Sequence, residues 1–65
     1  MYITESTVKR IMKEAGAKRI SSDASRYLQK RINVMLFDIS KKAVRLSKHA
    51  RRKTVDVSDV RLACN

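Results

Sequence analysis

Two short segments of the sequence combine basic side chains with residues that begin helices. Lys18-Arg19-Ile20-Ser21-Ser22-Asp23 and Arg52-Lys53-Thr54-Val55-Asp56 both contain a basic pair, a β-branched residue and a helix-capping residue. Arginine and lysine pair with phosphate oxygens, and a threonine hydroxyl can donate to a phosphate at modest entropic cost. These segments therefore suggest binding to a polyanion backbone. Likenesses this short also arise by chance, and the rival interpretation is two solvated basic loops.

Other residues that could do chemistry are few. Cys64 is the only cysteine and His49 the only histidine, so one chain cannot supply the four ligands of a zinc site. The six carboxylates are spread among helix caps and ion-pair positions, and no glycine-rich phosphate loop is present. We expect no metal, no cofactor and no enzymatic activity.

The charge balance points to the same class of partner. Sixteen Lys and Arg against six Asp and Glu give a formal net charge of +10, which favours association with polyanions. With 43% apolar residues, no proline and one glycine, the chain is too hydrophobic for a disordered basic tail and is typical of helices.

No apolar run approaches the roughly 18 residues that span a bilayer, and residues 1–15 lack a signal-peptide stretch. We therefore expect a cytoplasmic, chromosome-associated protein. A membrane-active helix is disfavoured because, of Trp and Phe, only Phe37 is available.

Short helices are predicted near both ends of the sequence. The first runs from about Thr4, as N-cap, to Ala15, and Gly16 supplies a left-handed stop. The third begins at Asp56 with Asp59 in capping-box position, and its two turns make it marginal by itself. We expect it to turn three residues inward: Val60, Ala63 and Cys64.

A long helix is predicted between them, from Asp23 to Ala50, with a cap at Ser21 or Ser22. Nearly thirty residues span roughly 40 Å, whereas a compact globule of 65 residues is about 28 Å across. The apolar stripe therefore cannot be buried within one chain, and we predict an obligate dimer with a second copy crossing under two-fold symmetry. The stripe consists of Ala24, Leu28, Ile32, Met35, Ile39, Ala43, Leu46 and Ala50, widened by Tyr27, Val34, Leu36 and Val44.

This order of short helix, basic turn, long helix, basic turn and short helix resembles the histone fold, and specifically the archaeal histones. The resemblance implies an all-α, single histone-fold domain over residues 1–65, with two short strand or loop segments. It also implies that two such domains pair in a handshake dimer, and that the dimer wraps and compacts duplex DNA. It rests on Ile11, Lys13, Ala15-Gly16-Ala17, Arg19, Ser21, Asp23-Ala24, Asp38-Ile39, Leu46, His49-Ala50, Arg52-Lys53-Thr54, Asp59 and Leu62-Ala63.

The resemblance also assigns roles to the basic residues. In that family the first turn of one protomer lies beside the second turn of its partner, through a short parallel strand pairing. It implies that Arg19 enters a DNA minor groove while Lys53 and Thr54 fix phosphates. Arg10 and Lys13, on the polar side of the first helix, would add phosphate contacts at the dimer centre. For other basic residues a solvated face is an equally good interpretation: Lys9, Lys41, Lys42, Arg45 and Lys48.

A second set of implied roles concerns assembly of dimers into tetramers or filaments. Leu46 and His49 would meet their copies across a four-helix seam, with His49 bonding to Asp59 of the other dimer. Asp59 has rival uses, as the capping-box acid and as an ion-pair partner of Arg52. Gly16 would permit close stacking of neighbouring DNA gyres. From the residues alone, His49 is more simply a capping or surface histidine.

The sequence departs from the family pattern at three places. Arg51 occupies a position where the family commonly has glycine, and a left-handed arginine costs on the order of 1 kcal/mol. Either the helix stops differently there or the charge is retained for DNA. The prolines that often precede the first helix are missing, and the third helix ends early, which leaves terminal packing open. The alternative function is a histone-fold subunit of a sequence-selective transcription heterodimer.

Overall fold

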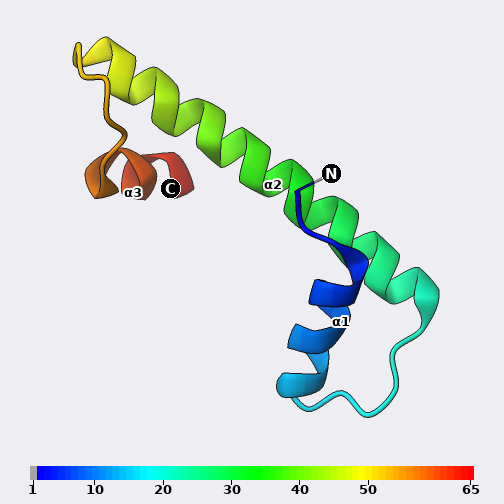
Figure 1. The fold of residues 1–65 in the computed structure, drawn as a ribbon. Helices are drawn as coiled ribbons and strands as arrows, with labels where there is room; N and C mark the ends of the chain where they lie inside the picture. The colour runs from blue at the N-terminus through cyan, green and yellow to red at the C-terminus, as the bar shows by residue number, and fades with distance from the viewer. Residues whose placement is uncertain (1) are drawn as a thin grey trace. The chain divides into compact units, whose positions relative to one another are not determined.

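The computed structural model describes residues 2–65 as three α-helices joined by two loops (Figure 1). Helix α1 is Glu5–Glu14, α2 is Ser22–His49 and α3 is Val57–Cys64. No strand is present among residues 2–65. The all-α prediction is confirmed, and the bounds of the helices fall within one residue of those expected from the apolar pattern.

Each helix begins at a side-chain cap. The Thr4 Oγ1 accepts from the backbone N–H of Thr7 at 3.3 Å, and the Ser21 Oγ accepts from that of Ala24 at 3.1 Å. Ser21, rather than Ser22, is therefore the residue that caps α2. Helix α3 has a complete capping box, in which the Asp56 carboxylate accepts from the first turn and the N3 carboxylate, Asp59, accepts from Asp56 N.

Helix α1 ends in a left-handed cap. Gly16 has a φ of 116°, and its N–H donates to the carbonyl of Lys13 at 3.0 Å. The N–H of Ala17 reaches back to the carbonyl of Met12 at 3.0 Å. This pair of bonds is a Schellman motif, in which glycine adopts a positive φ without a steric penalty.

Helix α2 ends in the same motif, built on an arginine. Arg51 has a φ of 60°, its N–H donates to the Lys48 carbonyl at 2.9 Å, and Arg52 N donates to the Ser47 carbonyl at 3.0 Å. The helix therefore stops as it would with glycine, and Arg51 carries the cost of the left-handed conformation. Of the two explanations for Arg51, the one in which the helix ends in a different conformation is excluded, and the one in which the charge is retained for DNA stays a prediction.

The chain divides into two compact units, one up to Val34 and one from Met35 onward. In the first unit, α1 lies beside the N-terminal half of α2 (Figure 1), with Val8 of α1 and Ser25 of α2 fully buried. In the second unit, α3 doubles back beside the C-terminal half of α2, and Ala43 and Ala63 are buried.

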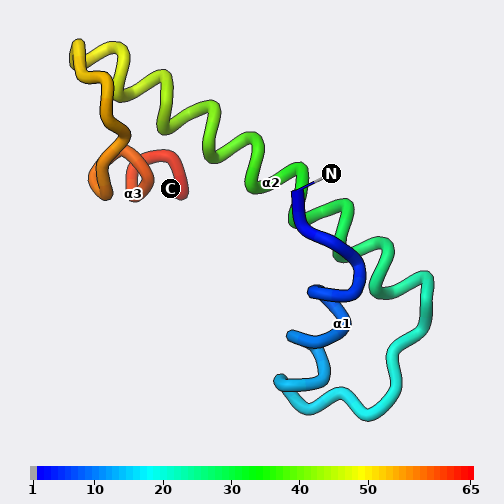
Figure 2. The backbone as a smooth tube through the Cα atoms, in the orientation of Figure 1, coloured from blue at the N-terminus to red at the C-terminus, as the bar shows by residue number. Residues whose placement is uncertain are grey.

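Polar side chains of α2 hold the N-terminal segment, which Figure 2 shows passing alongside the helix. The Asn33 Oδ1 accepts from the N–H groups of Tyr2 and Ile3 at 3.1 and 2.7 Å. The Asn33 Nδ2 donates to the Ile3 carbonyl at 3.1 Å, and the Gln29 Nε2 donates to the same carbonyl at 3.0 Å. These contacts fix the segment that precedes α1.

The prediction for the inward face of α3 is partly wrong. Ala63 is buried, and Val60, although 40% exposed, lines an apolar hollow shared with α2, whereas Cys64 is exposed. The buried face of α3 consists of Asp59 and Ala63, which are four residues apart and share one side of the helix. The arginine partner of Asp59 explains how a carboxylate can be buried on this face.

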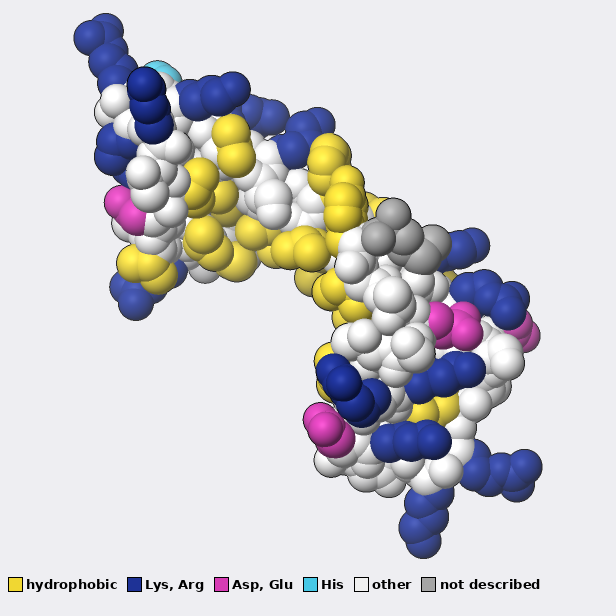
Figure 3. Space-filling view, viewed as in Figure 1, with side chains coloured by type: hydrophobic (Ala, Val, Ile, Leu, Met, Phe, Trp, Pro, Cys, Tyr) yellow, Lys and Arg dark blue, Asp and Glu magenta, His cyan; other side chains and the backbone are white. Residues whose placement is uncertain are grey.

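The apolar stripe is largely uncovered. Among residues 2–65 the only buried hydrophobic residues are Val8, Ala43 and Ala63, whereas twelve large hydrophobic residues are exposed. Figure 3 shows such side chains gathered on the surface along α2. Tyr27 is 68% exposed and, at about 100° per residue, lies on nearly the opposite side of α2 from the buried Ser25. An apolar surface of this extent requires a partner, and the dimer is the prediction that supplies one.

We expect Arg51→Gly to raise the free energy of unfolding. Glycine removes the steric cost of the left-handed conformation, and its greater unfolded-state entropy offsets part of the gain, leaving about 0.5–1 kcal/mol. Urea denaturation at fixed protein concentration measures the change. Arg51→Ala is the matched control, since it removes the charge and keeps the strained backbone. A glycine variant no more stable than the alanine variant would contradict the argument.

Candidate nucleic-acid interface

The loop between α2 and α3 is held from its inner side by Ser47. This serine is 2% exposed, and its Oγ lies 3.1 Å from the carbonyl oxygen of Arg52 and 3.0 Å from that of Thr54. One hydroxyl hydrogen is thus shared between two loop carbonyls. The backbone oxygens of the loop point inward as a result, while the side chains of Lys53 and Thr54 are exposed.

Arg52 ties the same loop to α3. Its Nη2 lies 2.7 Å from Asp59 Oδ1 and its Nη1 lies 2.9 Å from Asp59 Oδ2, a bidentate pair. Nη1 also donates to the Thr54 carbonyl at 3.2 Å and to Asp56 Oδ2 at 3.1 Å. The Asp59 side chain is 4% exposed, so removal of the arginine would leave a buried carboxylate without its main partner.

The protonation equilibria reflect this network. The hydrogen bond from Arg52, followed by the one from the Asp56 backbone, lowers the pKa of Asp59 below its ordinary 3.8. The hydrogen bond from Ser58 is the main reason that the pKa of Asp56 is also lowered. The bond to Asp59 raises the pKa of Arg52. Both carboxylates therefore remain charged at neutral pH and hold the loop through charged hydrogen bonds.

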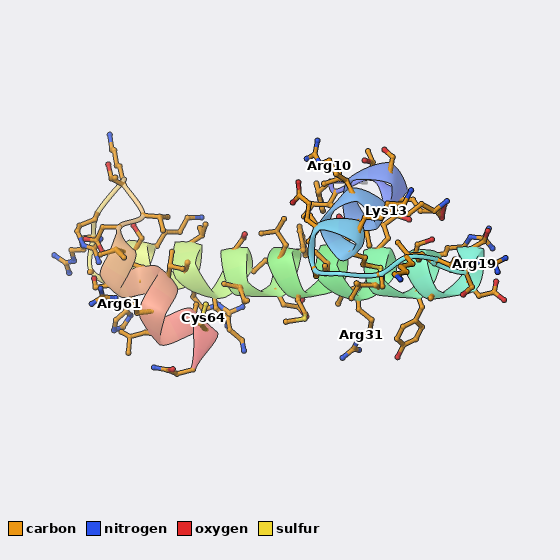
Figure 4. All side chains as sticks on the ribbon, turned by 90° about the horizontal axis from the view of Figure 1, so that it is seen from below. Arg10, Lys13, Arg19, Arg31, Arg61 and Cys64 are labelled. Carbon is orange, nitrogen blue, oxygen red and sulfur yellow. The ribbon has the colours of Figure 1, made fainter. Side chains whose placement is uncertain are left out.

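The first unit presents its predicted DNA-binding residues at the surface. Arg10 and Lys13 are exposed on α1, and Arg19 is exposed in the loop that leads to α2 (Figure 4). Within residues 2–65 none of the three takes part in an ion pair. Nearby, Glu5 pairs instead with Lys9 at 3.5 Å and with Arg26 at 3.7 Å.

Most of the positive charge is not neutralised within the chain. Lys9, Arg26 and Arg52 are the basic residues that form ion pairs in the described residues, so thirteen of the sixteen Lys and Arg do not. The four carboxylates in these pairs are Glu5, Asp23, Asp56 and Asp59. An uncompensated surplus of this size, present in both units, suits a polyanion that contacts many sites at once.

The residues predicted for a seam between dimers differ in their accessibility. His49 is the last residue of α2 and is exposed, and Leu46 is partly buried. Asp59 is 3% exposed, and its two oxygens already accept from the Arg52 guanidinium and the Asp56 N–H. Around Gly16 no heavy atom would lie within 4 Å of an added Cβ, so its φ, and not crowding within the chain, accounts for glycine there.

Three positioning residues were missed in the sequence: Ser47, Gln29 and Asn33. Each occupies a position in α2 at which the helical period places a side chain beside the apolar stripe, where a polar residue that becomes buried needs a hydrogen-bond partner. That mismatch between residue type and position was the available signal. Among the described residues no helix is long and apolar enough to cross a membrane, and no group of three potential metal ligands occurs.

Comparison with known proteins places the chain among histone-fold proteins. Residues 1–64 match the model of a family described as histone-like transcription factor (CBF/NF-Y) and archaeal histone. A probable archaeal histone 3 of Methanocaldococcus jannaschii is 46% identical over 54 residues, covering 83% of this chain and 81% of that protein. One of the subunits of the archaeal histone HAN1 of Thermococcus zilligii is 41% identical over 56 residues, covering 86% and 84%.

The Asp59 network predicts a loss of stability in acid. Because the pKa values of Asp56 and Asp59 are lowered by folding, their contribution to stability is complete above pH 3.8 and is lost as pH falls below it. Urea midpoints between pH 6 and pH 2 should therefore fall less steeply in Asp59→Asn than in wild type. Arg52→Gln should flatten the same window, since it removes the other half of the pair. A wild-type slope in both variants would assign the acid sensitivity to other carboxylates.

Proposed function

Because this chain belongs to the family of histone-like transcription factors and archaeal histones, we propose that it is a non-enzymatic protein that binds duplex DNA. It wraps and compacts the DNA with little preference for sequence and associates with the chromosome. The observation that carries this proposal is the surplus of thirteen basic residues outside any ion pair of the described chain. Phosphate contacts from such a surface carry no sequence information.

The proposed interface consists of the residues that the two loops and α1 expose. Arg19 enters a minor groove, Lys53 and Thr54 bind phosphates, and Arg10 and Lys13 add phosphate contacts. Support comes from the inner side of the second loop, where Ser47 and Arg52 hold the backbone and leave the Lys53 and Thr54 side chains exposed. A loop whose conformation is fixed before binding loses less conformational entropy when it contacts DNA.

The binding unit in this proposal is a homodimer. Two copies cross along their α2 helices in the handshake arrangement, which covers the apolar stripe and brings the first loop of one copy beside the second loop of the other. The sequence-selective heterodimer remains the alternative, and the family description includes transcription factors. Both relatives described above are named as archaeal histones, which favours a histone over a transcription subunit and leaves the choice between homodimer and heterodimer to experiment. A homodimer in sedimentation equilibrium of the purified protein would support the proposal.

Higher assembly forms a further part of the proposal. Leu46 and His49 meet their copies in a second dimer, His49 bonds to Asp59 across the seam, and Gly16 allows neighbouring turns of the superhelix to approach. The exposure of His49 supports this arrangement. Asp59 would accept the additional bond with a remaining lone-pair site, since a carboxylate offers about four.

Salt dependence tests the proposed function. If a dimer neutralises about 6–10 phosphates, raising the salt from about 50 to 200 mM should weaken binding by about 10³–10⁵. The loss should be nearly equal for duplexes of unrelated sequence, measured by fluorescence anisotropy. A shallow salt slope, or a preference of more than about 100-fold for one duplex, would contradict non-specific wrapping.

Within the same titration, Arg19→Ala separates the loop contact from general charge. It should weaken binding and reduce DNA bending more than Arg61→Ala, which removes the same charge from an exposed position on α3 (Figure 4). The thermal midpoint of the free protein should be unchanged in both, since neither side chain forms an ion pair in the described residues. Equal effects on DNA would remove the special role of Arg19.

His49→Ala tests the seam. Because two-fold symmetry places the His49–Asp59 bond twice, one substitution removes two charge-assisted bonds worth about 1.5–3 kcal/mol each. Tetramers and longer assemblies on DNA should be lost while dimers persist, as read from sedimentation and from nuclease-protected fragment lengths. An unchanged ladder of protected fragments would show that assembly uses another surface.

A further inference from the structure

The second unit carries a surface patch that contains none of the five residues assigned above to DNA contacts. Six residues of α2 line one shallow hollow, which we call the outer patch: Phe37, Ser40, Lys41, Val44, Arg45 and Lys48. Phe37 is 47% exposed and Val44 is 41% exposed. None of the six is acidic, and the three cations among them form no ion pair within residues 2–65. The outer patch is therefore an apolar pair bordered by positive charge.

Phe37 and the three cations of the outer patch lie on a different side of α2 from the buried residues of this unit, whereas Val44 also belongs to the predicted apolar stripe. The buried side of α2 in this unit is marked by Ala43 and Ser47, and a separate apolar hollow between α2 and α3 includes Ile39, Val55 and Val60. At about 100° per residue, Phe37, Lys41 and Lys48 are turned between a third and a half of a revolution away from Ala43. Ser40 and Val44 form the border between the two hollows.

Figure 3 shows basic and hydrophobic side chains interspersed along the edge of α2 that faces away from α3. Phe37, Lys41, Arg45 and Lys48 do not line the apolar hollow between the two helices, so filling that hollow leaves these four side chains exposed. Its composition also excludes duplex DNA as the best occupant. The ring of Phe37 cannot hydrogen-bond to a phosphate. The Lys41 ammonium lies 5.6 Å from the ring centroid and covers the face on which a base would stack.

We propose that the outer patch docks an acidic amphipathic helix of a partner protein. Phe37 and Val44 are seven residues apart, so they lie two helical turns, about 10 Å, from each other. Apolar residues at positions i, i+3 and i+7 of a partner helix match that spacing. Carboxylates that flank these positions meet Lys41, Arg45 and Lys48. The inference uses none of the five residues assigned to DNA contacts, although its three cations belong to the basic surplus that supports DNA binding.

The probe for the test is a synthetic sixteen-residue helical peptide with leucine at i, i+3 and i+7 and glutamate at the flanking positions. Its control is a scrambled peptide of the same composition, with the leucines distributed around the helix. Binding of both to the full chain is measured by fluorescence anisotropy, and methyl NMR follows Val44 during the titration. We expect the amphipathic peptide to bind at least ten-fold more tightly than the scrambled one and to shift the Val44 signals.

Two charge reversals at adjacent positions supply the matched variants. Lys41 lines the outer patch, whereas Lys42 lines a separate hollow with Leu46 and Leu62. Lys41→Glu should weaken peptide binding at least ten-fold, and Lys42→Glu by less than three-fold. Both side chains are exposed, so neither change should alter the circular dichroism spectrum. Phe37→Ala should likewise weaken the peptide and leave DNA binding unchanged.

Three results would overturn the proposal. Equal binding of the two peptides, or equal effects of the two charge reversals, would show only the general attraction of a polyanion to a cationic chain. Unshifted Val44 signals in the wild-type protein would place the peptide elsewhere, without reliance on any variant. A loss of DNA affinity in Lys41→Glu much larger than in Lys42→Glu would make nucleic acid the occupant of the outer patch. The salt titration of DNA binding is a separate measurement, so either proposal can fail alone.

Discussion

The length of α2 is the constraint on which the rest of the structure depends. A helix of 28 residues has more apolar surface than two helices of 10 and 8 residues can cover. Three buried hydrophobic residues do not make a core that can offset the conformational entropy of this chain. The stripe must therefore be covered by another chain, and the charged side chains occupy the rest of the surface. The proposed dimer is thus a consequence of the excess length of α2.

Polar contacts determine the local geometry that the small core leaves unspecified. Ser47 and the Arg52–Asp59 pair fix the second loop, and Gln29 and Asn33 fix the N-terminal segment through the Ile3 carbonyl. Buried bonds of this kind are directional, so they select one backbone path where apolar packing would tolerate several. The same loop exposes Lys53 and Thr54 because its carbonyls are engaged on the inner side. The positioning of the candidate interface is thus a result of hydrogen bonding more than of hydrophobic burial.

Much of the fold followed from the sequence because its signals are local. The caps at Thr4, Ser21 and Asp56 and the stop at Gly16 depend on residues within one or two turns, and the bounds of the helices were predicted accordingly. The inward face of α3 was less accessible, because the burial of Asp59 depends on Arg52, seven residues away. The hydrogen bonds between Asn33 and Ile3, which are thirty residues apart, depend on how the N-terminal segment packs against α2. A single sequence contains no measure of such contacts.

The composition of the buried residues affects how much folded protein is present in a cell. Within residues 2–65 four polar residues, Ser25, Gln29, Ser47 and Asp59, are buried alongside only three apolar residues. A single chain therefore has a defined local geometry but little hydrophobic stabilisation. By mass action, its folded fraction then rises with its own concentration, as it does for any protein whose folding is coupled to pairing. Copies produced in excess of available partners would expose backbone to proteases, whereas paired copies would be protected. Pairing would thereby set an upper limit on the amount of unassembled basic protein, without a dedicated regulator.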